Sequence, residues 1–420
     1  MSVTLAPAQN WPQWLGENRD SKAAFNPPKT WPKELTQKWK VTVGDGVATP
    51  SLVGDKLYVF AREGGGEILR CLDATTGKEL WQDKHDVLAA TGPAQGFSGP
   101  RCTPTVADGK VVTLGLRGTL TCYDAATGKQ LWRKDDFKNS YPRFFTSASP
   151  VIVDGLCVAQ LGGNDNGGVI AYDLASGAEK WRWTGDGPSY ASTMLMTVAG
   201  TKLVVAETDK KIVGLGVKDG QLLWEIPFAV QGRGYNASTP IVDGDTMIYG
   251  GSGRGLTAVK IEKTGGAFAP KELWKNTDNS VQFNTPLLKG GVLYGLTANN
   301  EFFCVKDGKT AWTAPLTPPA AETSAGGPGA EAEEDRGGGR RGGRGGGRTA
   351  GYGQIVDAGS VILALTPSTS ELVAFLPSDK SYTEVARIKV ASTPTFAYPV
   401  LSGNRIFIKD QNDVTLYTVQ

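Results

Sequence analysis

Residues that could carry out acid–base or metal chemistry are few in this sequence. His85 is the only histidine among 420 residues, so histidine-dependent triads and multi-histidine zinc sites have almost no material. The five cysteines are odd in number and widely spaced without a CxxC pair, which fits neither a disulfide framework nor a zinc site. The glycine-rich stretch at residues 161–169 lacks the spacing and the acidic residues of an EF-hand calcium loop. The sequence therefore predicts no catalytic residue and no metal site.

A second set of side chains has the composition of a binding site. Aromatic, arginine and amide residues recur just before a series of short apolar segments, and acids are rare among them. Arginine and tyrosine are enriched at binding hot spots. We therefore expect an anionic or aromatic ligand, or a peptide carboxylate, to bind there; the alternative is that the rings merely fill a channel. The candidates are Arg101, Arg143, Phe144, Tyr190, Arg233, Tyr235, Asn236, Phe283, Asn284, Tyr352, Gln354 and Tyr398.

The element that must position these side chains is a repeat anchored on tryptophan. Asp73-Ala-Thr-Thr-Gly-Lys-Glu-Leu-Trp81 and Asp124-Ala-Ala-Thr-Gly-Lys-Gln-Leu-Trp132 are two clear copies. From Trp81 to Trp312 the repeated tryptophans are 38 to 51 residues apart. A Thr-Pro or Ser-Pro pair opens most units, and Gly, Asp and Asn turns separate short alternating strands. Four short strands in a unit of this length are typical of a β-propeller blade.

The repeat predicts an all-β fold, an eight-bladed β-propeller of four-stranded antiparallel blades. Residues 353–390 form a blade that has no tryptophan, and residues 394–420 supply three strands of the last blade. We expect residues 35–43 to add its fourth strand, so that N- and C-terminal strands close the ring in one shared blade without an open edge. The repeated tryptophans are expected to dock between adjacent blades, and they are Trp39, Trp81, Trp132, Trp181, Trp224, Trp274 and Trp312.

Repeat position also explains several residues that would otherwise resemble catalytic groups. Asp73 and its equivalents precede a tight turn, where a carboxylate accepts backbone N–H bonds and the following glycine takes a positive φ. Cys71, Cys122 and Cys304 share one repeat position with Ala171, which indicates a requirement for a small side chain. We interpret these thiols as packing residues.

Composition sets the domain boundaries. Residues 35–420 form a single propeller domain, preceded by a leader at residues 9–34. For residues 1–8, which end Ala-Pro-Ala, a remnant of a secretory signal peptide and a plain flexible terminus are both open. Residues 315–351 are rich in Gly, Arg and Glu, so we expect a disordered insertion between blades six and seven. Nearby acids offset its arginines, which favours a solvated loop over nucleic-acid binding.

Charge and hydropathy add two expectations about partners. The net charge of +2 favours neither an acidic nor a basic partner, and we expect a monomer. No run of 18 apolar residues is present, so the sequence predicts no transmembrane helix.

The motif Asp-x-x-Thr-Gly-Lys-x-x-Trp with a Thr-Pro opening resembles the pyrroloquinoline-quinone-like (PQQ-like) β-propeller repeat family. The resemblance covers about residues 35–420 apart from the insertion, and Trp11-Pro-Gln-Trp-Leu-Gly resembles the leader of secreted members from planctomycete-type bacteria. The family includes the BamB assembly scaffold and quinoprotein dehydrogenases. The scaffold resemblance implies a non-catalytic, periplasmic or secreted protein that binds a protein or a small anionic or aromatic ligand at the funnel mouth, without a cofactor.

The alternative that the same resemblance implies is a PQQ-dependent oxidoreductase of the alcohol or sugar dehydrogenase type, with PQQ and calcium. The dehydrogenases are marked by adjacent cysteines, an aspartate base and Glu/Asn calcium ligands at the funnel. This chain has no Cys-Cys pair, and its funnel segments are poor in carboxylates. These departures favour the non-catalytic interpretation.

Overall fold

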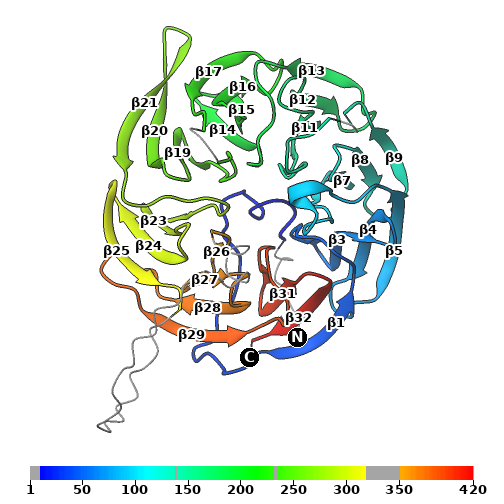
Figure 1. Cartoon of the computed structure of the whole chain (residues 1–420), viewed down its shortest axis with the longest axis vertical. Coiled ribbons are helices and arrows are strands. Elements are labelled where there is room, and N and C mark those ends of the chain that lie inside the picture. The colour runs from blue at the N-terminus through cyan, green and yellow to red at the C-terminus, as the bar shows by residue number, and fades with distance from the viewer. Residues whose placement is uncertain (1–9, 138–139, 231–233, 318–350, 420) are drawn as a thin grey trace, which may run out of the picture.

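The computed structural model describes residues 10–137, 140–230, 234–317 and 351–419. These residues form eight four-stranded sheets arranged in a ring (Figure 1). All strand pairs within the sheets are antiparallel, and in the described residues the only helix is the short 3₁₀ turn η1 (Gly92–Ala94). The predicted all-β, eight-bladed propeller is therefore confirmed. Among the described residues, no helix has the length and hydropathy needed to cross a bilayer.

Each blade runs in chain order from an inner strand to an outer strand. Blades 1 to 3 are β2 (Ser51–Val53), β3 (Lys56–Glu63), β4 (Gly66–Asp73), β5 (Glu79–Asp86); β6 (Thr105–Ala107), β7 (Lys110–Leu114), β8 (Leu120–Asp124), β9 (Gln130–Lys134); and β10 (Val151–Val153), β11 (Leu156–Leu161), β12 (Gly168–Asp173), β13 (Glu179–Trp183). Blades 4 and 5 are β14 (Met194–Val198), β15 (Thr201–Glu207), β16 (Lys211–Gly216), β17 (Leu222–Pro227); and β18 (Ile241–Asp243), β19 (Thr246–Gly251), β20 (Gly255–Thr264), β21 (Ala267–Asn276). Blades 6 and 7 are β22 (Leu287–Lys289), β23 (Val292–Leu296), β24 (Glu301–Lys306), β25 (Lys309–Pro315); and β26 (Gln354–Asp357), β27 (Ile362–Leu365), β28 (Glu371–Phe375), β29 (Glu384–Lys389).

Blade 8 closes the ring with strands from both ends of the chain. It consists of β30 (Val400–Ser402), β31 (Arg405–Lys409), β32 (Asp413–Thr418) and, outermost, β1 (Thr36–Thr42). β1 pairs with β32 in antiparallel register, with Trp39 opposite Leu416. The predicted closure in one shared blade is confirmed, and it joins the last blade to the first because the chain continues from β1 into blade 1.

The Thr or Ser at the opening of most units has a structural reason. The hydroxyl of Ser192 accepts the backbone N–H of Ser149 at 2.9 Å, and the hydroxyl of Thr239 accepts that of Ser192 at 3.1 Å. Thr285 accepts the N–H of Thr239 in the same way at 3.1 Å. These bonds run from blade to blade around the inner strands, and they satisfy backbone donors that would otherwise be buried without a partner.

Five of the seven repeated tryptophans lie against a turn glycine of the following blade: Trp39, Trp81, Trp132, Trp181 and Trp274. A Cβ placed on Gly177 of blade 3 would come within 2.8 Å of the Trp132 ring of blade 2, and Gly177 has a φ of +71°. The Trp132 indole also donates to Leu174 O at 2.9 Å. The glycine is thus required both by backbone conformation and by the close approach of the indole.

Blade 5 departs from this arrangement. The hairpin of β20 and β21 is extended to 10 residues per strand and replaces the short Thr-Gly turn. Trp224 of blade 4 is buried, but its Nε1 has no hydrogen-bond partner among the described residues. No turn glycine of blade 5 lies against Trp224, so the contact between blades 4 and 5 differs from that between Trp132 and Gly177.

The five cysteines are free and buried. Cys122 packs with apolar residues of blades 2 and 3, including Val112 and Ile170. Burial raises the pKa of the Cys122 thiol to about 12, so the thiolate that nucleophilic chemistry requires is not formed at neutral pH.

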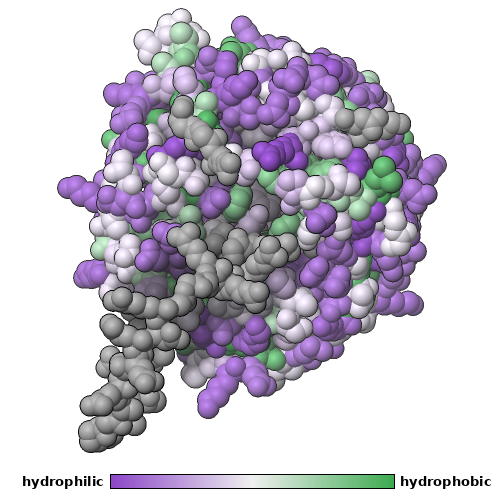
Figure 2. All heavy atoms as spheres, viewed as in Figure 1, coloured by the Kyte–Doolittle hydropathy of each residue, from purple (hydrophilic) through white to green (hydrophobic). Residues whose placement is uncertain are grey.

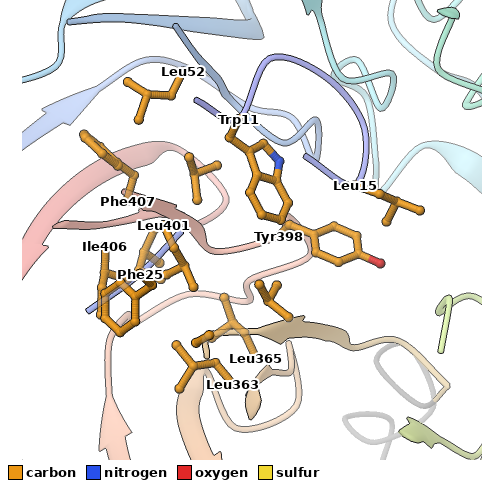
Figure 3. Packing of buried hydrophobic residues seen from close by; sticks show 14 of the residues in the cluster. Trp11, Leu15, Phe25, Leu52, Leu363, Leu365, Tyr398, Leu401, Ile406 and Phe407 are labelled. Atoms are coloured by element: carbon orange, nitrogen blue, oxygen red, sulfur yellow. The ribbon is translucent and has the colours of Figure 1, made fainter. Parts of the chain in front are cut away.

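Part of the leader lies inside the ring (Figure 1). Trp11 is fully buried and exchanges backbone hydrogen bonds of 2.8 and 2.9 Å with Leu52 of blade 1. Figure 3 shows Trp11 beside Tyr398, with Phe25 packed among residues of blade 8. The expected signal remnant at residues 1–8 lies outside the described residues. So does most of the expected insertion, residues 318–350, although Pro315 ends β25 and Leu316 is buried.

Candidate functional site at the funnel mouth

A hollow of about 250 Å³ lies at the centre of one face of the ring. Its walls come from the segments that precede the inner strands, as the repeat predicts, and from the loop that contains η1. Figure 2 shows this face, with a largely hydrophilic rim and a recess toward the middle. The volume lies just below the usual range for small-ligand pockets, about 300–1,000 Å³, which suits a small ligand or a single protruding group.

One wall of the hollow is a cluster of three aromatic rings. Phe144 and Tyr235 meet edge to face with centroids 4.6 Å apart, and Tyr190 meets Tyr235 edge to face at 5.8 Å. The Tyr190 hydroxyl accepts the backbone N–H of Phe144 at 3.0 Å, which fixes the ring. Burial raises the pKa of Tyr190 to about 12, so the hydroxyl stays neutral and acts only as a hydrogen-bonding group.

A second aromatic cluster lines the same hollow. Phe283 and Tyr352 are stacked with centroids 4.3 Å apart, and Phe396 meets Tyr352 edge to face at 5.1 Å. Phe97, from the loop after η1, meets Phe396 edge to face at 5.1 Å. Gln354 is held beside this cluster because its Nε2 donates to Phe396 O at 2.9 Å. Rings that pack on one another in this way are preorganised and lose little entropy when a flat ligand binds.

Arg101 supplies positive charge to the hollow. Its guanidinium donates to the backbone oxygens of Phe144 and, at 3.1 Å, Phe97, so it lies between the two clusters. Arg101 makes no ion pair with any carboxylate of the described residues. Desolvation by burial lowers its pKa, but a guanidinium stays protonated at neutral pH. The described lining contains no acid that could neutralise it.

The structure does not place all of the predicted binding residues at the mouth. Tyr398 is fully buried, because Trp14 packs edge to face on its ring at 5.1 Å and Trp11 lies 6.3 Å away, so its assignment to the mouth was wrong. Asn284 is also buried, and its amide donates to Leu296 O at 3.0 Å and to Gly351 O at 3.1 Å.

Two other candidates line a neighbouring hollow of about 350 Å³, which shares Tyr190 and Tyr235 with the first. Arg143 reaches this second hollow and not the first. Asn236 also borders it, but it is buried, and its amide nitrogen donates to Thr208 O at 2.9 Å while its amide oxygen accepts from Arg254 at 2.6 Å. Arg233 lies outside the described residues.

Sequence reasoning missed several residues of the hollow. Trp14 of the leader lines it, although Trp14 belongs to no repeat. Phe97 and Phe396 lie within four and two residues of the candidates Arg101 and Tyr398, and their aromatic character was the signal that could have included them. Pro93 and Ala94 of η1 come from a loop between β5 and β6 whose path the repeat does not specify.

The donor atoms at the mouth do not match a calcium-bound quinone site. Calcium requires six to eight oxygen ligands, usually with several carboxylates. No acid lines the described hollow, and no cluster of three or more His, Cys, Asp or Glu suited to a metal occurs in the described part of the chain. The five cysteines are free, and no two of them are adjacent in the sequence.

Comparison with known proteins identifies the family. The family model of the outer membrane protein assembly factor BamB matches residues 64–314. The chain is 24% identical over 282 residues to BamB of Burkholderia pseudomallei, covering 58% of this chain and 69% of that protein. It is 29% identical over 163 residues to a quinohemoprotein alcohol dehydrogenase of Comamonas testosteroni, covering 36% of this chain but only 22% of that enzyme.

Solved structures show the same fold at low sequence identity. The BamB structure from Moraxella catarrhalis superposes with a TM-score of 0.63 at 14% identity, covering 92% of this chain and all of that one. The quinohemoprotein alcohol dehydrogenase of Comamonas testosteroni gives a TM-score of 0.64 at 14% identity, covering 97% of this chain and 80% of that one. The tryptophan repeat, the eight-bladed ring and a family match over more than half of the sequence agree, and the chain belongs to the BamB-like family of PQQ-like β-propellers.

Proposed function

We propose that this protein is a non-catalytic binding propeller of the bacterial cell envelope, which takes a protein segment or a small anionic or aromatic ligand at its funnel mouth. The observation that carries the proposal is the combination of two preorganised aromatic clusters with the Arg101 guanidinium in a hollow whose described lining has no acid. Such a surface favours a flat group that brings a negative charge or a hydrogen-bond acceptor.

The scaffold part of the proposal is supported by the relatives. The proteins named outer membrane protein assembly factor BamB match across more than half of this chain in Burkholderia pseudomallei and in Yersinia pestis. A shared fold is weak evidence for a shared partner. We therefore propose an extracytoplasmic location and a binding role, and we name the partner only by its chemistry.

The quinoprotein relatives suggest a second activity, which the chemistry of the mouth does not favour. Quinone binding with calcium would need carboxylate ligands that the described lining lacks. Reconstitution with PQQ and calcium, followed by gel filtration and absorbance of the protein fraction, tests this directly. We expect no stoichiometric, calcium-dependent uptake; stoichiometric uptake would replace the binding role with a quinoprotein role.

The mouth site itself can be tested with 8-anilinonaphthalene-1-sulfonate (ANS), which pairs a flat aromatic group with one negative charge. We expect one saturable site on the folded protein. Replacing Arg101 with Met removes the cation but keeps an apolar side chain, and the loss of a charge-assisted bond of about 1.5–3 kcal/mol should weaken binding on the order of 10- to 100-fold.

A matched control is available on an outer strand of blade 3. Arg182→Met removes an arginine from the outer strand β13, where its guanidinium pairs with Glu179 at 2.6 Å and does not line the hollow. ANS affinity should be unchanged in this variant. Equal affinities for Arg101→Met and wild type would mean that ANS does not use the mouth, and the binding proposal would be dropped.

A further inference from the structure

Residues 11–21 of the leader, called the plug below, cross the middle of the ring (Figure 1). Hydrogen bonds join the plug to blade 1 through Trp11 and Leu52, and to blade 2, where the Val106 N–H donates to Pro12 O at 2.8 Å. On the side of blade 7, the Asp357 N–H donates to Ser21 O at 2.9 Å. The plug is therefore anchored by its backbone at both of its ends.

A buried cation, Arg19, also anchors the plug. Arg19 is only 4% exposed, and its guanidinium donates to the backbone oxygens of Pro150 and Thr193, which open blades 3 and 4, and to Gln13 of the plug. Arg19 has a positive φ of 57°. Leu15 and Ser21 also have positive φ values, 63° and 57°. Conformations of this kind persist only where the surrounding structure determines them, so the plug is a built element of the propeller.

Trp14 is the plug residue that lines the hollow. Its Nε1 donates to Thr239 Oγ1 at 3.1 Å, and Thr239 lies between the mouth residue Ala237 and the start of inner strand β18. The ring packs against Tyr398 below, yet it remains partly exposed and lines the hollow. Trp14 therefore lies between the hollow, which it lines together with the aromatic clusters, and the buried ring of Tyr398.

We infer that the plug is the floor of the mouth site and that Trp14 is a ligand-contacting residue supplied by a segment outside the repeat. The site is then a blind pocket, which admits the end of a ligand or a single protruding group and not a chain threaded through the ring. This inference rests on the proposed binding function. It also implies coupling, because a ligand that contacts Trp14 must stabilise the seated plug as much as the seated plug favours the ligand.

The test measures ANS affinity and hydrogen exchange on the full chain. Trp14→Ala removes the floor and should weaken ANS binding at least tenfold, as Arg101→Met does from the wall. The exchange rates of the Trp11 and Leu52 amides, which the plug pairing protects, should stay unchanged in the variant and show that the plug remains in place. In the wild type, ANS should slow exchange within residues 11–21.

The outcomes separate the two proposals. If Arg101→Met weakens binding and Trp14→Ala does not, the floor role is wrong and the mouth site stands. If neither variant weakens binding, both proposals fall. If Trp14→Ala loses plug protection, Trp14→Phe and Trp14→Leu decide: we expect near-wild-type affinity for Phe and at least several-fold weaker affinity for Leu, and equal affinities would overturn the inference.

Discussion

The contact between Trp132 and Gly177 offers a quantitative test of how adjacent blades are joined. Gly177→Ala would add a Cβ at a position where φ is +71° and where the indole of Trp132 already lies 2.8 Å away. Gly155 of the same blade is a matched control, because its φ is +74° but no atom lies within 4 Å of an added Cβ. Both substitutions carry the same backbone penalty, and only Gly177→Ala displaces the tryptophan.

The expected magnitudes follow from these two contributions. An alanine in the left-handed region costs about 1–2 kcal/mol, so Gly155→Ala should destabilise by that amount. Gly177→Ala adds overpacking against a buried ring, which typically costs a further 1–3 kcal/mol. We therefore expect a total of about 2–5 kcal/mol for Gly177→Ala, with the difference between the two variants assigned to the contact between blades 2 and 3.

Urea unfolding followed by tryptophan fluorescence and circular dichroism measures this difference. The two signals should change together, since the ring is closed and unfolding of one blade opens the others. Equal loss of stability in Gly155→Ala and Gly177→Ala would refute the reasoning, because it would show that the indole moves aside without cost.

Three further predictions concern single buried groups. Trp132→Phe removes an indole that donates to Leu174 O, whereas Trp224→Phe removes one whose Nε1 has no described partner, so in urea unfolding the first should lose about 1 kcal/mol more than the second. Burial raises the pKa of the Glu207 carboxyl well above 4.5, so the free energy of unfolding falls as pH rises above 4.5. Glu207→Gln should be about 1–3 kcal/mol more stable at pH 7 and should remove this pH dependence. Urea unfolding of both proteins at pH 5 and pH 8 would show the difference. Lys409 donates to three backbone oxygens, and burial lowers its pKa from 10.5 to about 8. Between these two pH values the unfolded chain binds more protons than the folded one, so the free energy of unfolding should rise with pH by up to about 3 kcal/mol. Lys409→Met should lose this rise and should be less stable at pH 7, as unfolding at pH 7 and at pH 10 would show.

The parts of the fold that repeat were predictable, and the parts that occur once were not. Trp39 could be assigned to the closing blade because its position follows the phase of the repeat, and its pairing with Leu416 follows from that assignment. Arg101 could be placed at the mouth by counting back from the Thr-Pro pair of its blade. Because the units repeat, the geometry of one blade predicts the geometry of the others.

Residues that depend on long-range, non-repeated contacts could not be placed in this way. Tyr398 precedes Pro399 and so has the position of the Thr or Ser that opens other units, two residues after the mouth residue Phe396. Trp11 and Trp14 of the leader also cover its ring. The leader binds the ring through single contacts such as Arg19 with the carbonyl of Thr193, which have no equivalent elsewhere in the chain. The extra residues of the extended β20–β21 hairpin can be counted in the sequence. That no turn glycine of this blade lies against Trp224 could be seen only in the structure.

The most direct test of the binding role is a crystal structure of the protein soaked with ANS. We expect its aromatic rings between the Phe144 and Tyr352 clusters, its sulfonate beside the Arg101 guanidinium and its deepest edge on Trp14. Ordered ANS only on the outer strands, or an empty mouth in crystals that are saturated with ANS, would contradict the account.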